Sequence, residues 1–336
     1  MNLSERIKSF SLLGAYILEN PSALQETVYK TFLYNNWFTP ENTQQSLRNI
    51  AAEFLQEEKL RDWTAGYALE DTPSNTIALV AAGNIPLVGF HDILCVLISG
   101  NRLQLKLSEK DRFLYPFLLE QLCRIEPRFT ERIAIQERLG GFDAIIATGS
   151  NNTARHFEYY FSKYPNIIRR NRHSLAVLDG TETTEELQQL GHDVFDYFGL
   201  GCRNVSKIFI PREYDVRVFR DVWNDWKEPL MSHNSYRNNL DYQRTLYLMN
   251  QTPLVDIDFV NMVELPGLHS PVSCLHLERY DDMAEVQAYI QAHREQIQCV
   301  ADKQGQFDQI RFGQTQSPGL ADYADHVDTI DFLLRL

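Results

Sequence analysis

Apolar residues in the first 65 positions of the chain recur at the spacing of an amphipathic helix. Ile7, Phe10 and Leu13 would lie on one face of such a helix. Pro21 and Pro40 mark breaks between successive helical segments. No pattern in this region points to chemistry, so we assign it a packing role.

From residue 76 onwards, apolar runs of strand length alternate with helical patterns. We expect strands over residues 76–82, 103–107, 143–148 and 174–178, and helices over residues 87–98, 111–125, 153–164 and about 183–198. This alternating order favours a parallel sheet with right-handed crossovers. In such sheets, ligands bind at the carboxyl ends of the strands.

The second half of the chain has a more mixed pattern. It predicts strands over residues 206–210, 272–277 and 297–300, and helices over residues 216–226, 240–250 and 283–294. The whole pattern therefore predicts an α/β fold of two domains, residues 1–185 and residues 186–310. We expect the tail, residues 311–336, to pack back on the first domain.

Composition narrows the class of protein. The chain has 336 residues, of which 44% are apolar, so we expect a globular protein with a full core. The net charge of −13 argues against nucleic acid as a partner, because neutralising its phosphates needs clustered Lys and Arg. No apolar run reaches about 18 residues, so no membrane span is expected. The polar N-terminus lacks the features of a signal peptide, which predicts a cytoplasmic location.

The ends of the first three predicted strands carry polar residues and glycines. They are Gly83 and Asn84, then Lys106, Ser108 and Glu109, then Thr148, Gly149 and Ser150. A Gly-Ser step that opens a helix offers backbone N–H groups to a phosphate. A lysine beside a carboxylate suits ribose hydroxyls or a ribose phosphate. The standard G-x-G-x-x-G fingerprint of dinucleotide-binding folds is absent from the sequence.

The five cysteines are odd in number, and no two of them form a C-x-x-C pair. We therefore expect no disulfide framework and no metal site. Cys202 differs from the others because it follows a turn that contains Gly199 and Gly201 and precedes a predicted strand. This setting presents a thiol from a rigid loop, although a buried structural thiol beside a tight turn has the same pattern.

Four segments together resemble one superfamily. Residues 83–87 resemble the N-x-P loop of aldehyde dehydrogenases, residues 100–109 resemble their G-N-x-x-x-x-K-x-S-E segment, and residues 148–150 resemble their T-G-S turn. The loop at 201–206, Gly-Cys-Arg-Asn-Val-Ser, follows in the matching order and is similar to that of the LuxC-like acyl-CoA reductase family. The resemblance covers about residues 75–335.

This resemblance implies an aldehyde dehydrogenase-like fold, with a Rossmann-type nicotinamide-cofactor domain within residues 1–185 and a catalytic domain within 186–310. It implies Cys202 as the acylated nucleophile and Asn84 as the side-chain donor to the oxyanion. The cofactor contacts that it implies are Lys106, Ser108, Glu109, Thr148, Gly149 and Ser150. The resemblance favours NADPH, whereas the charge of Glu109 should repel a 2′-phosphate and favours NADH.

Two departures from the superfamily pattern affect the expected reaction. Residues 169–174 carry no carboxylate where hydrolytic aldehyde dehydrogenases have a general-base glutamate. Residues 267–271 match the E-x-F-G-P motif only in part, and Glu264 is the only glutamate nearby. Hydrolysis of an acyl-enzyme needs a base, whereas exchange between two thioesters does not. We therefore expect reduction of acyl-CoA, or another acyl thioester, to an aldehyde through a cysteinyl thioester with hydride from NAD(P)H.

Two other functions stay open at this stage. One is a Cys-dependent acyl hydrolase or acyltransferase in which His173 or His192 assists Cys202. The other is a non-catalytic relative that binds acyl chains or a partner subunit. The arginines within residues 169–172 are candidates to lower the pKa of the Cys202 thiol or to bind phosphates. A homo-oligomer or an acyl-donor partner protein is compatible with the sequence.

Overall fold

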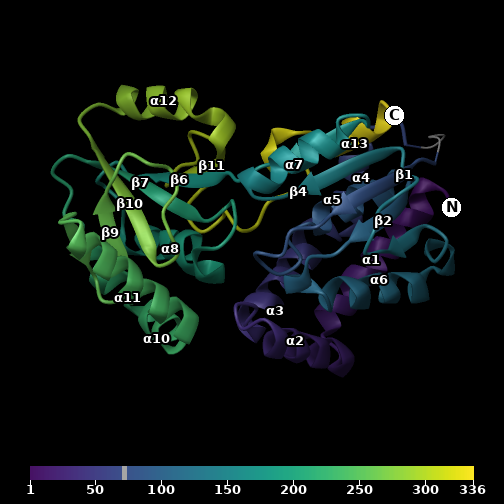
Figure 1. The fold of residues 1–336 in the computed structure, drawn as a ribbon, viewed down its shortest axis with the longest axis horizontal. Coiled ribbons are helices and arrows are strands. Elements are labelled where there is room, and N and C mark those ends of the chain that lie inside the picture. The colour runs from purple at the N-terminus through teal and green to yellow at the C-terminus, as the bar shows by residue number, and fades with distance from the viewer. Residues whose placement is uncertain (70–73) are drawn as a thin grey trace. The chain divides into compact units, whose positions relative to one another are not determined.

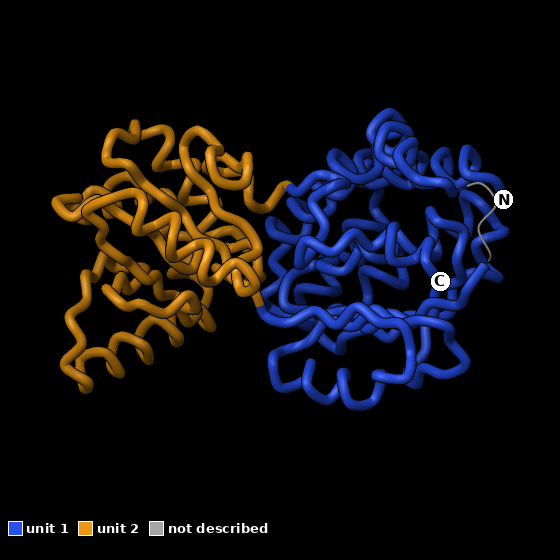
Figure 2. Tube along the Cα trace, turned by 90° about the horizontal axis from the view of Figure 1, so that it is seen from above, with its two compact units in different colours: residues 1–171, 318–336 blue, residues 172–317 orange. Residues whose placement is uncertain are grey.

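The computed structural model describes residues 1–69 and 74–336 and divides into two compact units (Figure 2). Unit 1 consists of Met1–Asn171 and Pro318–Leu336, and unit 2 consists of Arg172–Ser317. Each unit has its own sheet. Among the described residues, no helix is both long and apolar enough to cross a membrane.

The sheet of unit 1 is entirely parallel and has the order β3-β2-β1-β4-β5. Its strands are β1 (Thr76–Val80), β2 (Arg102–Lys106), β3 (Ile133–Ile135), β4 (Ala144–Thr148) and β5 (Asn166–Arg169). The central strand, β1, is buried along most of its length. Parallel sheets with both faces covered need such continuous apolar runs, which explains the composition of this strand.

Helices cover both faces of this sheet (Figure 1). They are α1 (Leu3–Glu19), α2 (Ser22–Tyr34), α3 (Pro40–Asn49), α4 (Glu57–Thr64), α5 (Phe90–Ile98), α6 (Leu114–Ile125), α7 (Asn151–Phe161) and α13 (Thr329–Leu334). Alternate residues of β1 point to opposite faces. Ile77 and Leu79 join the large core that contains the N-terminal helices, whereas Ala78 packs in the smaller core against which Phe157 and Phe161 of α7 lie.

A buried ion pair ties together segments of unit 1 that are far apart in sequence. The Arg169 guanidinium at the end of β5 lies 2.6 Å from the Asp92 carboxylate on α5. It also donates to Thr329 Oγ1 at 3.0 Å and to the Ala324 carbonyl in the C-terminal tail. The Arg169 and Asp92 side chains are only 4% and 9% exposed, so this pair is screened little by water.

The sheet of unit 2 has the order β11-β6-β7-β10-β9-β8, and only β8 runs antiparallel to its neighbour. Its strands are β6 (His173–Val177), β7 (Val205–Pro211), β8 (Leu254–Asp256), β9 (Asn261–Glu264), β10 (Cys274–Tyr280) and β11 (Ile297–Asp302). Its helices are α8 (Thr184–Phe195), α9 (Val218–Val222), α10 (Asn224–Ser232), α11 (Asn234–Met249) and α12 (Met283–Ala292). Helix α12 lies on one face of the sheet, and α8, α10 and α11 lie on the other (Figure 1).

Most predicted elements are present, with shifted ends. The helix expected over 87–98 begins only at Phe90, because the backbone at Leu87 has φ 57° and leaves the helical region. The strands β3, β5, β8 and β9 were not predicted. Each has only three or four residues, which is too short for a period-2 pattern to stand out.

The unit boundaries differ from the predicted domain boundaries. We placed the first boundary at 185/186, but the structure divides the chain at 171/172 because β6 pairs with β7 and β11 in the second sheet. The tail was expected from residue 311. Residues 311–317 belong to unit 2, where the buried Asp193 carboxylate accepts from the Gly313 N–H at 2.7 Å, and only Pro318–Leu336 belong to unit 1.

Replacing Asp92 with Ala should destabilise unit 1 by about 3–5 kcal/mol, because it leaves the Arg169 cation buried without its counter-charge. Urea denaturation followed by circular dichroism measures this loss. The matched control is Glu120→Ala, which breaks the exposed pair with Arg124 on α6 and should cost only about 0.3–0.5 kcal/mol. Equal losses for the two variants would contradict the role given to the buried pair.

Candidate functional site

The strand ends singled out in the sequence lie at one edge of the unit 1 sheet. In the parallel register, Val80 of β1 pairs with Lys106 of β2 and with Ala147 of β4. The three segments that follow these strands therefore leave the sheet at the same edge. The structure thus places Asn84, the residues around Ser108 and the turn at 148–150 after the carboxyl ends of three adjacent strands.

The first two of these segments are in direct contact. A Cβ atom on Gly83 would lie 2.4 Å from Ser108 Oγ, so only glycine lets the backbone pass this close to the serine. Lys106, Glu109 and Asn84 are exposed beside this contact. This edge therefore presents a cation, a carboxylate and an amide to solvent within two adjoining loops.

The third segment opens helix α7. Ser150 is the N-cap residue, and its hydroxyl accepts from the Thr153 N–H at 3.3 Å. The Gly149 N–H donates to the Arg169 carbonyl at 3.2 Å, and a Cβ atom on Gly149 would lie 2.9 Å from Thr153 Cβ. The close approach requires glycine, and the helix N-terminus carries a partial positive charge that favours an anion at this edge.

The loop that carries Asn84 has a strained backbone. Leu87 has φ 57°, a left-handed conformation that costs a bulky residue about 1–3 kcal/mol. The side chains that bond this loop are Ser46, Asp111 and Tyr115. Sequence reasoning missed all three, because they lie on other elements and belong to no motif.

Cys202 lies in unit 2, in a turn between α8 and the start of β7. Four residues on its N-terminal side have positive φ angles: Tyr197 at 54°, Phe198 at 61°, Gly199 at 73° and Gly201 at 106°. Cys202 itself is partly exposed. A chain in this conformation reverses direction within a few residues, which is why the sequence needs glycines here.

Hydrogen bonds fix this turn from two sides. The Ser174 hydroxyl on β6 donates to the Cys202 carbonyl at 2.8 Å. The buried Asn204 amide donates to the Asp196 carbonyl at 2.8 Å, which holds the turn to the end of α8. Together these bonds hold the peptide that follows Cys202 and the start of the turn at Asp196. Neither Ser174 nor Asn204 was proposed from the sequence, because each reads there as an ordinary polar residue at a strand end.

A second cysteine lies close to this turn. Cys299 Sγ on β11 is 3.1 Å from the Ser174 hydroxyl. Complete burial raises the pKa of the Cys299 thiol to about 11, and the positive charge of Arg203 only partly offsets this effect. Cys299 therefore stays a neutral thiol at pH 7. None of the five cysteines, all of which lie in the described part of the chain, forms a disulfide.

Three histidines gather at the amino end of the unit 2 strands. The rings of His173 and His269 have centroids 5.0 Å apart, and His276 Nδ1 lies 2.9 Å from the Gly267 carbonyl. Burial, together with His269 and His276, lowers the pKa of His173 to about 4. At pH 7 His173 is therefore neutral, so it can accept a proton but holds none to donate as an acid.

The other proposed helpers of Cys202 are engaged elsewhere. His192 Nδ1 lies 3.2 Å from the Asp196 carboxylate, and this contact raises the pKa of the His192 imidazole. Of the three arginines proposed, Arg169 is buried against Asp92, Arg170 pairs with Glu158, and Arg172 donates to the Ile297 carbonyl at 3.3 Å. The prediction that Arg169 lowers the pKa of the cysteine or binds phosphate is therefore wrong, because its guanidinium is occupied inside unit 1.

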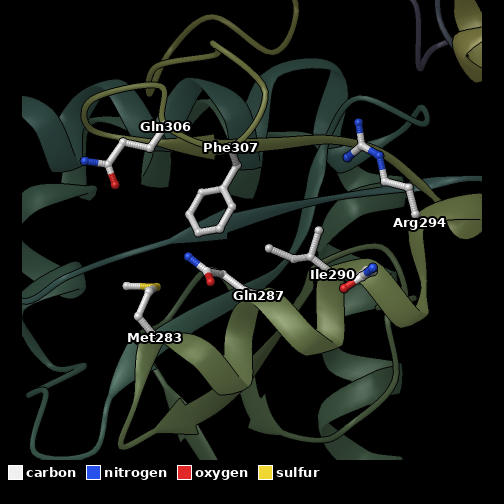
Figure 3. Close-up of a pocket in the computed structure, with 7 residues that line it drawn as sticks. Met283, Gln287, Ile290, Arg294, Gln306 and Phe307 are labelled. Carbon is white, nitrogen blue, oxygen red and sulfur yellow. The ribbon is translucent and has the colours of Figure 1, made fainter.

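Unit 2 contains a small cavity near the cysteine turn and a larger groove elsewhere. A small cavity of about 20 Å³ adjoins the cysteine turn and is lined by Phe198, Gly199 and Tyr236, among others. A larger groove of about 380 Å³ lies between α12 and the loop after β11, with Met283, Ile290 and Phe307 as its apolar residues (Figure 3). None of the site residues proposed from the sequence lines the larger groove.

The sequence matches one known protein family. A profile of the acyl-CoA reductase (LuxC) family matches residues 8–222, which is more than half of the chain. A search of curated proteins finds no match.

Solved structures of aldehyde dehydrogenases resemble the chain in fold. Aldehyde dehydrogenase 21 from Physcomitrella patens, in complex with the reaction product succinate, aligns with a TM-score of 0.70 and 10% identity over 100% of this chain and 84% of that chain. A mutant of aldehyde dehydrogenase C from Pseudomonas syringae, complexed with NAD⁺ and octanal, aligns with a TM-score of 0.65 and 12% identity. The alignment covers 90% of this chain and 72% of that chain. A Mycobacterium tuberculosis aldehyde dehydrogenase complexed with NAD⁺ aligns with a TM-score of 0.63 and 11% identity, over 90% of this chain and 73% of that chain. These alignments confirm the predicted α/β fold.

Replacing His173 with Gln should flatten the acid branch of the pH–stability profile. The unfolded chain binds a proton at this histidine near pH 6.5, whereas the folded protein binds it only near pH 4. Stability is therefore full above pH 6.5 and is lost as the pH falls towards 4. The shift corresponds to roughly 3 kcal/mol, which urea denaturation at pH 4, 5.5 and 7 measures.

His192→Gln is the matched control for this experiment. Because the pKa of His192 is raised, its contribution to stability is present below pH 6.5 and is lost as the pH rises through the folded value. The control should therefore leave the branch between pH 5.5 and pH 4 unchanged. A His173→Gln variant that keeps the wild-type acid branch would show that His173 is not the group responsible.

Proposed function

The chain belongs to the acyl-CoA reductase (LuxC) family of the aldehyde dehydrogenase superfamily, and from that premise we propose that it reduces acyl-CoA or another acyl thioester through a cysteinyl thioester at Cys202. Membership of this family makes the protein an oxidoreductase that acts on acyl or aldehyde substrates and forms aldehydes. The observation that carries the finer proposal is the setting of Cys202, which is partly exposed on a turn held by Ser174 and Asn204.

The reaction begins at the sulfur of Cys202. Its thiolate attacks the acyl carbonyl, the bond to coenzyme A breaks, and coenzyme A leaves as a thiolate that takes a proton from solvent. Thioester exchange is nearly balanced, because both sulfurs are similar leaving groups. The acyl group is then held on Cys202. A fixed turn favours this step, because the attacking sulfur is already placed before the substrate arrives.

We assign Asn84 the role of side-chain donor to the oxyanion that forms at the acyl carbonyl. The Asn84 side chain is exposed on a loop that three other side chains hold in place. Loss of one such donor typically costs about 10²–10³ in rate. The Cys202 backbone N–H is the second donor in this proposal, and the Ser174 bond to the Cys202 carbonyl holds the next peptide of the same turn.

The acyl-enzyme has to be protected from water until it is reduced. Segment 169–174 offers no carboxylate base, and Arg169 within it is buried against Asp92. At pH 7 His173 is neutral, and its ring packs against the ring of His269. The absence of a carboxylate in this segment supports thioester reduction over hydrolysis.

A nicotinamide cofactor suits the edge of unit 1 described above. When bound, such a cofactor would supply the hydride for reduction of the acyl group on Cys202. Cys202 would then leave as a thiolate and the product would be the aldehyde. The contacts that we propose are Lys106, Ser108 and Glu109 for the ribose, and Thr148, Gly149 and Ser150 for the pyrophosphate and nicotinamide. The glycine approaches and the N-terminus of α7 fit a phosphate-bearing ligand.

Cys202→Ala should abolish aldehyde formation from acyl-CoA in the presence of NADPH or NADH, because no other group forms the acyl-enzyme. Assays with acyl-CoAs of several chain lengths measure this loss. Cys123→Ala is the matched control, since Cys123 is also partly exposed but lies on α6, and it should keep wild-type turnover. Equal turnover by the wild type and Cys202→Ala would overturn the mechanism. Free fatty acid formed without aldehyde would indicate a hydrolase instead.

Glu109→Gln should shift the cofactor preference towards NADPH. A carboxylate about 4 Å from a 2′-phosphate is repelled by about 1 kcal/mol per charge even in water, which corresponds to about fivefold in affinity. Fluorescence titration of both cofactors measures the ratio of dissociation constants. Glu131→Gln is the control and should leave the ratio unchanged. Glu131 is an exposed glutamate just before β3, at the amino end of that strand. An unaltered ratio in Glu109→Gln would remove Glu109 from the ribose site.

A further inference from the structure

The loop that carries Asn84 contains a strained residue, Leu87, at its centre. Leu87 is buried, and its φ of 57° lies in the left-handed region, which leucine rarely adopts. Within the loop, residues 86–89 form a turn that the Phe90 N–H closes by donating to the Leu87 carbonyl at 2.9 Å, just where α5 begins. Such a conformation persists only when neighbouring groups determine it.

Three side chains from outside the loop bond its backbone. The Asp111 carboxylate accepts from the Leu87 N–H at 2.8 Å. The Tyr115 hydroxyl accepts from the Gly89 N–H, and the Ser46 hydroxyl donates to the Pro86 carbonyl, both at 2.8 Å. The Asp111 contact falls on the strained residue itself.

Asp111 also joins this loop to the segment proposed to bind the ribose. The Asp111 N–H donates to the Ser108 carbonyl at 3.2 Å, which closes the short turn Glu109–Asp111. Its side chain is completely buried. Burial raises the pKa of Asp111 to about 7, and the backbone N–H groups of Leu87 and Leu114 only partly offset this. An apolar side chain would be easier to bury here, so what a carboxyl group adds is its bonding to the backbone, to Leu87 in this loop and to Leu114 at the start of α6.

We propose that Asp111 is a positioning residue for the reaction: by fixing the strained backbone at Leu87, it holds the Asn84 amide in the orientation that receives the oxyanion. This inference rests on the proposed function, in which Asn84 is the oxyanion donor. It adds a residue that touches neither substrate nor cofactor and acts through the loop that its carboxyl group holds.

The test compares Asp111→Leu, Asp111→Asn and Asn84→Ala, alone and in combination. Asp111→Leu removes the acceptor for the Leu87 N–H and should lower kcat by about 10²–10³, as Asn84→Ala does. Asp111→Asn keeps an oxygen acceptor in the same place and should retain kcat within about threefold. The double variant Asn84→Ala, Asp111→Leu should be no slower than Asn84→Ala alone, because both changes remove the same donor.

Two further readouts separate positioning from general damage to the fold. The dissociation constant for the nicotinamide cofactor should change less than about twofold in Asp111→Leu, so that the loss appears in kcat. Hydrogen exchange should accelerate in the peptide that contains residues 83–90. Asp193→Leu is the matched control, because Asp193 is also buried and accepts from backbone N–H groups, at Gly313 and Thr315. In the double variant Asn84→Ala, Asp193→Leu, the fold loss in kcat should equal the product of the losses in the two single variants.

Each outcome decides the proposal. Two results would overturn it and leave the proposed function standing. In one, the fold losses in kcat of Asn84→Ala and Asp111→Leu multiply in the double variant. In the other, Asp111→Leu keeps the wild-type kcat while Asn84→Ala is slow. Wild-type kcat in Asn84→Ala, with Cys202→Ala inactive, would remove the oxyanion role of Asn84 and the positioning role with it. If Asp111→Leu does not fold, Tyr115→Phe replaces it. That variant removes only the acceptor for Gly89 and should lose about tenfold in kcat, again without multiplying with Asn84→Ala.

Discussion

The parallel pairing of β1 between β2 and β4 is the constraint on which the unit 1 site depends. Because Val80 is in register with both Lys106 and Ala147, three segments separated by tens of residues leave the sheet at one edge. The contact between Gly83 and Ser108 follows directly from that register. A slip of one residue in either pair would turn the side chains to the opposite faces of the sheet.

The cysteine turn is built on a different principle. Cys202 precedes β7, so it lies at the amino ends of the parallel strands of unit 2, whereas the unit 1 residues follow the carboxyl ends. The position of the Cys202 side chain is not set by the carboxyl end of a strand. Its position comes from a run of positive φ angles and from bonds made by Ser174 and Asn204. Both loops that carry the proposed chemistry therefore have strained backbones held by buried polar groups, which fixes their geometry before a ligand binds.

The sequence predicted the parts of this architecture that have a period or a motif. Strand and helix alternation predicted the sheet of unit 1, and the glycine turn read with the other motifs made Cys202 the candidate nucleophile. The roles of Asp111 and Ser174 could not be predicted, because each depends on a contact across the fold that no local pattern encodes. The unit boundary was misplaced because β6 resembles the preceding strands and reveals its partners only in the sheet. Arg169 looked like part of a charged cluster and is instead buried.

A single-turnover chase tests the central claim that Cys202 carries the acyl group to reduction. The protein is mixed with one equivalent of acyl-CoA without cofactor, and intact mass follows the acyl adduct. NADPH is then added, and the aldehyde is quantified. The account predicts an adduct on Cys202 that persists without cofactor and is converted to aldehyde in stoichiometric yield. Loss of the adduct as free acid before the cofactor is added, or aldehyde formed with no adduct, would contradict it.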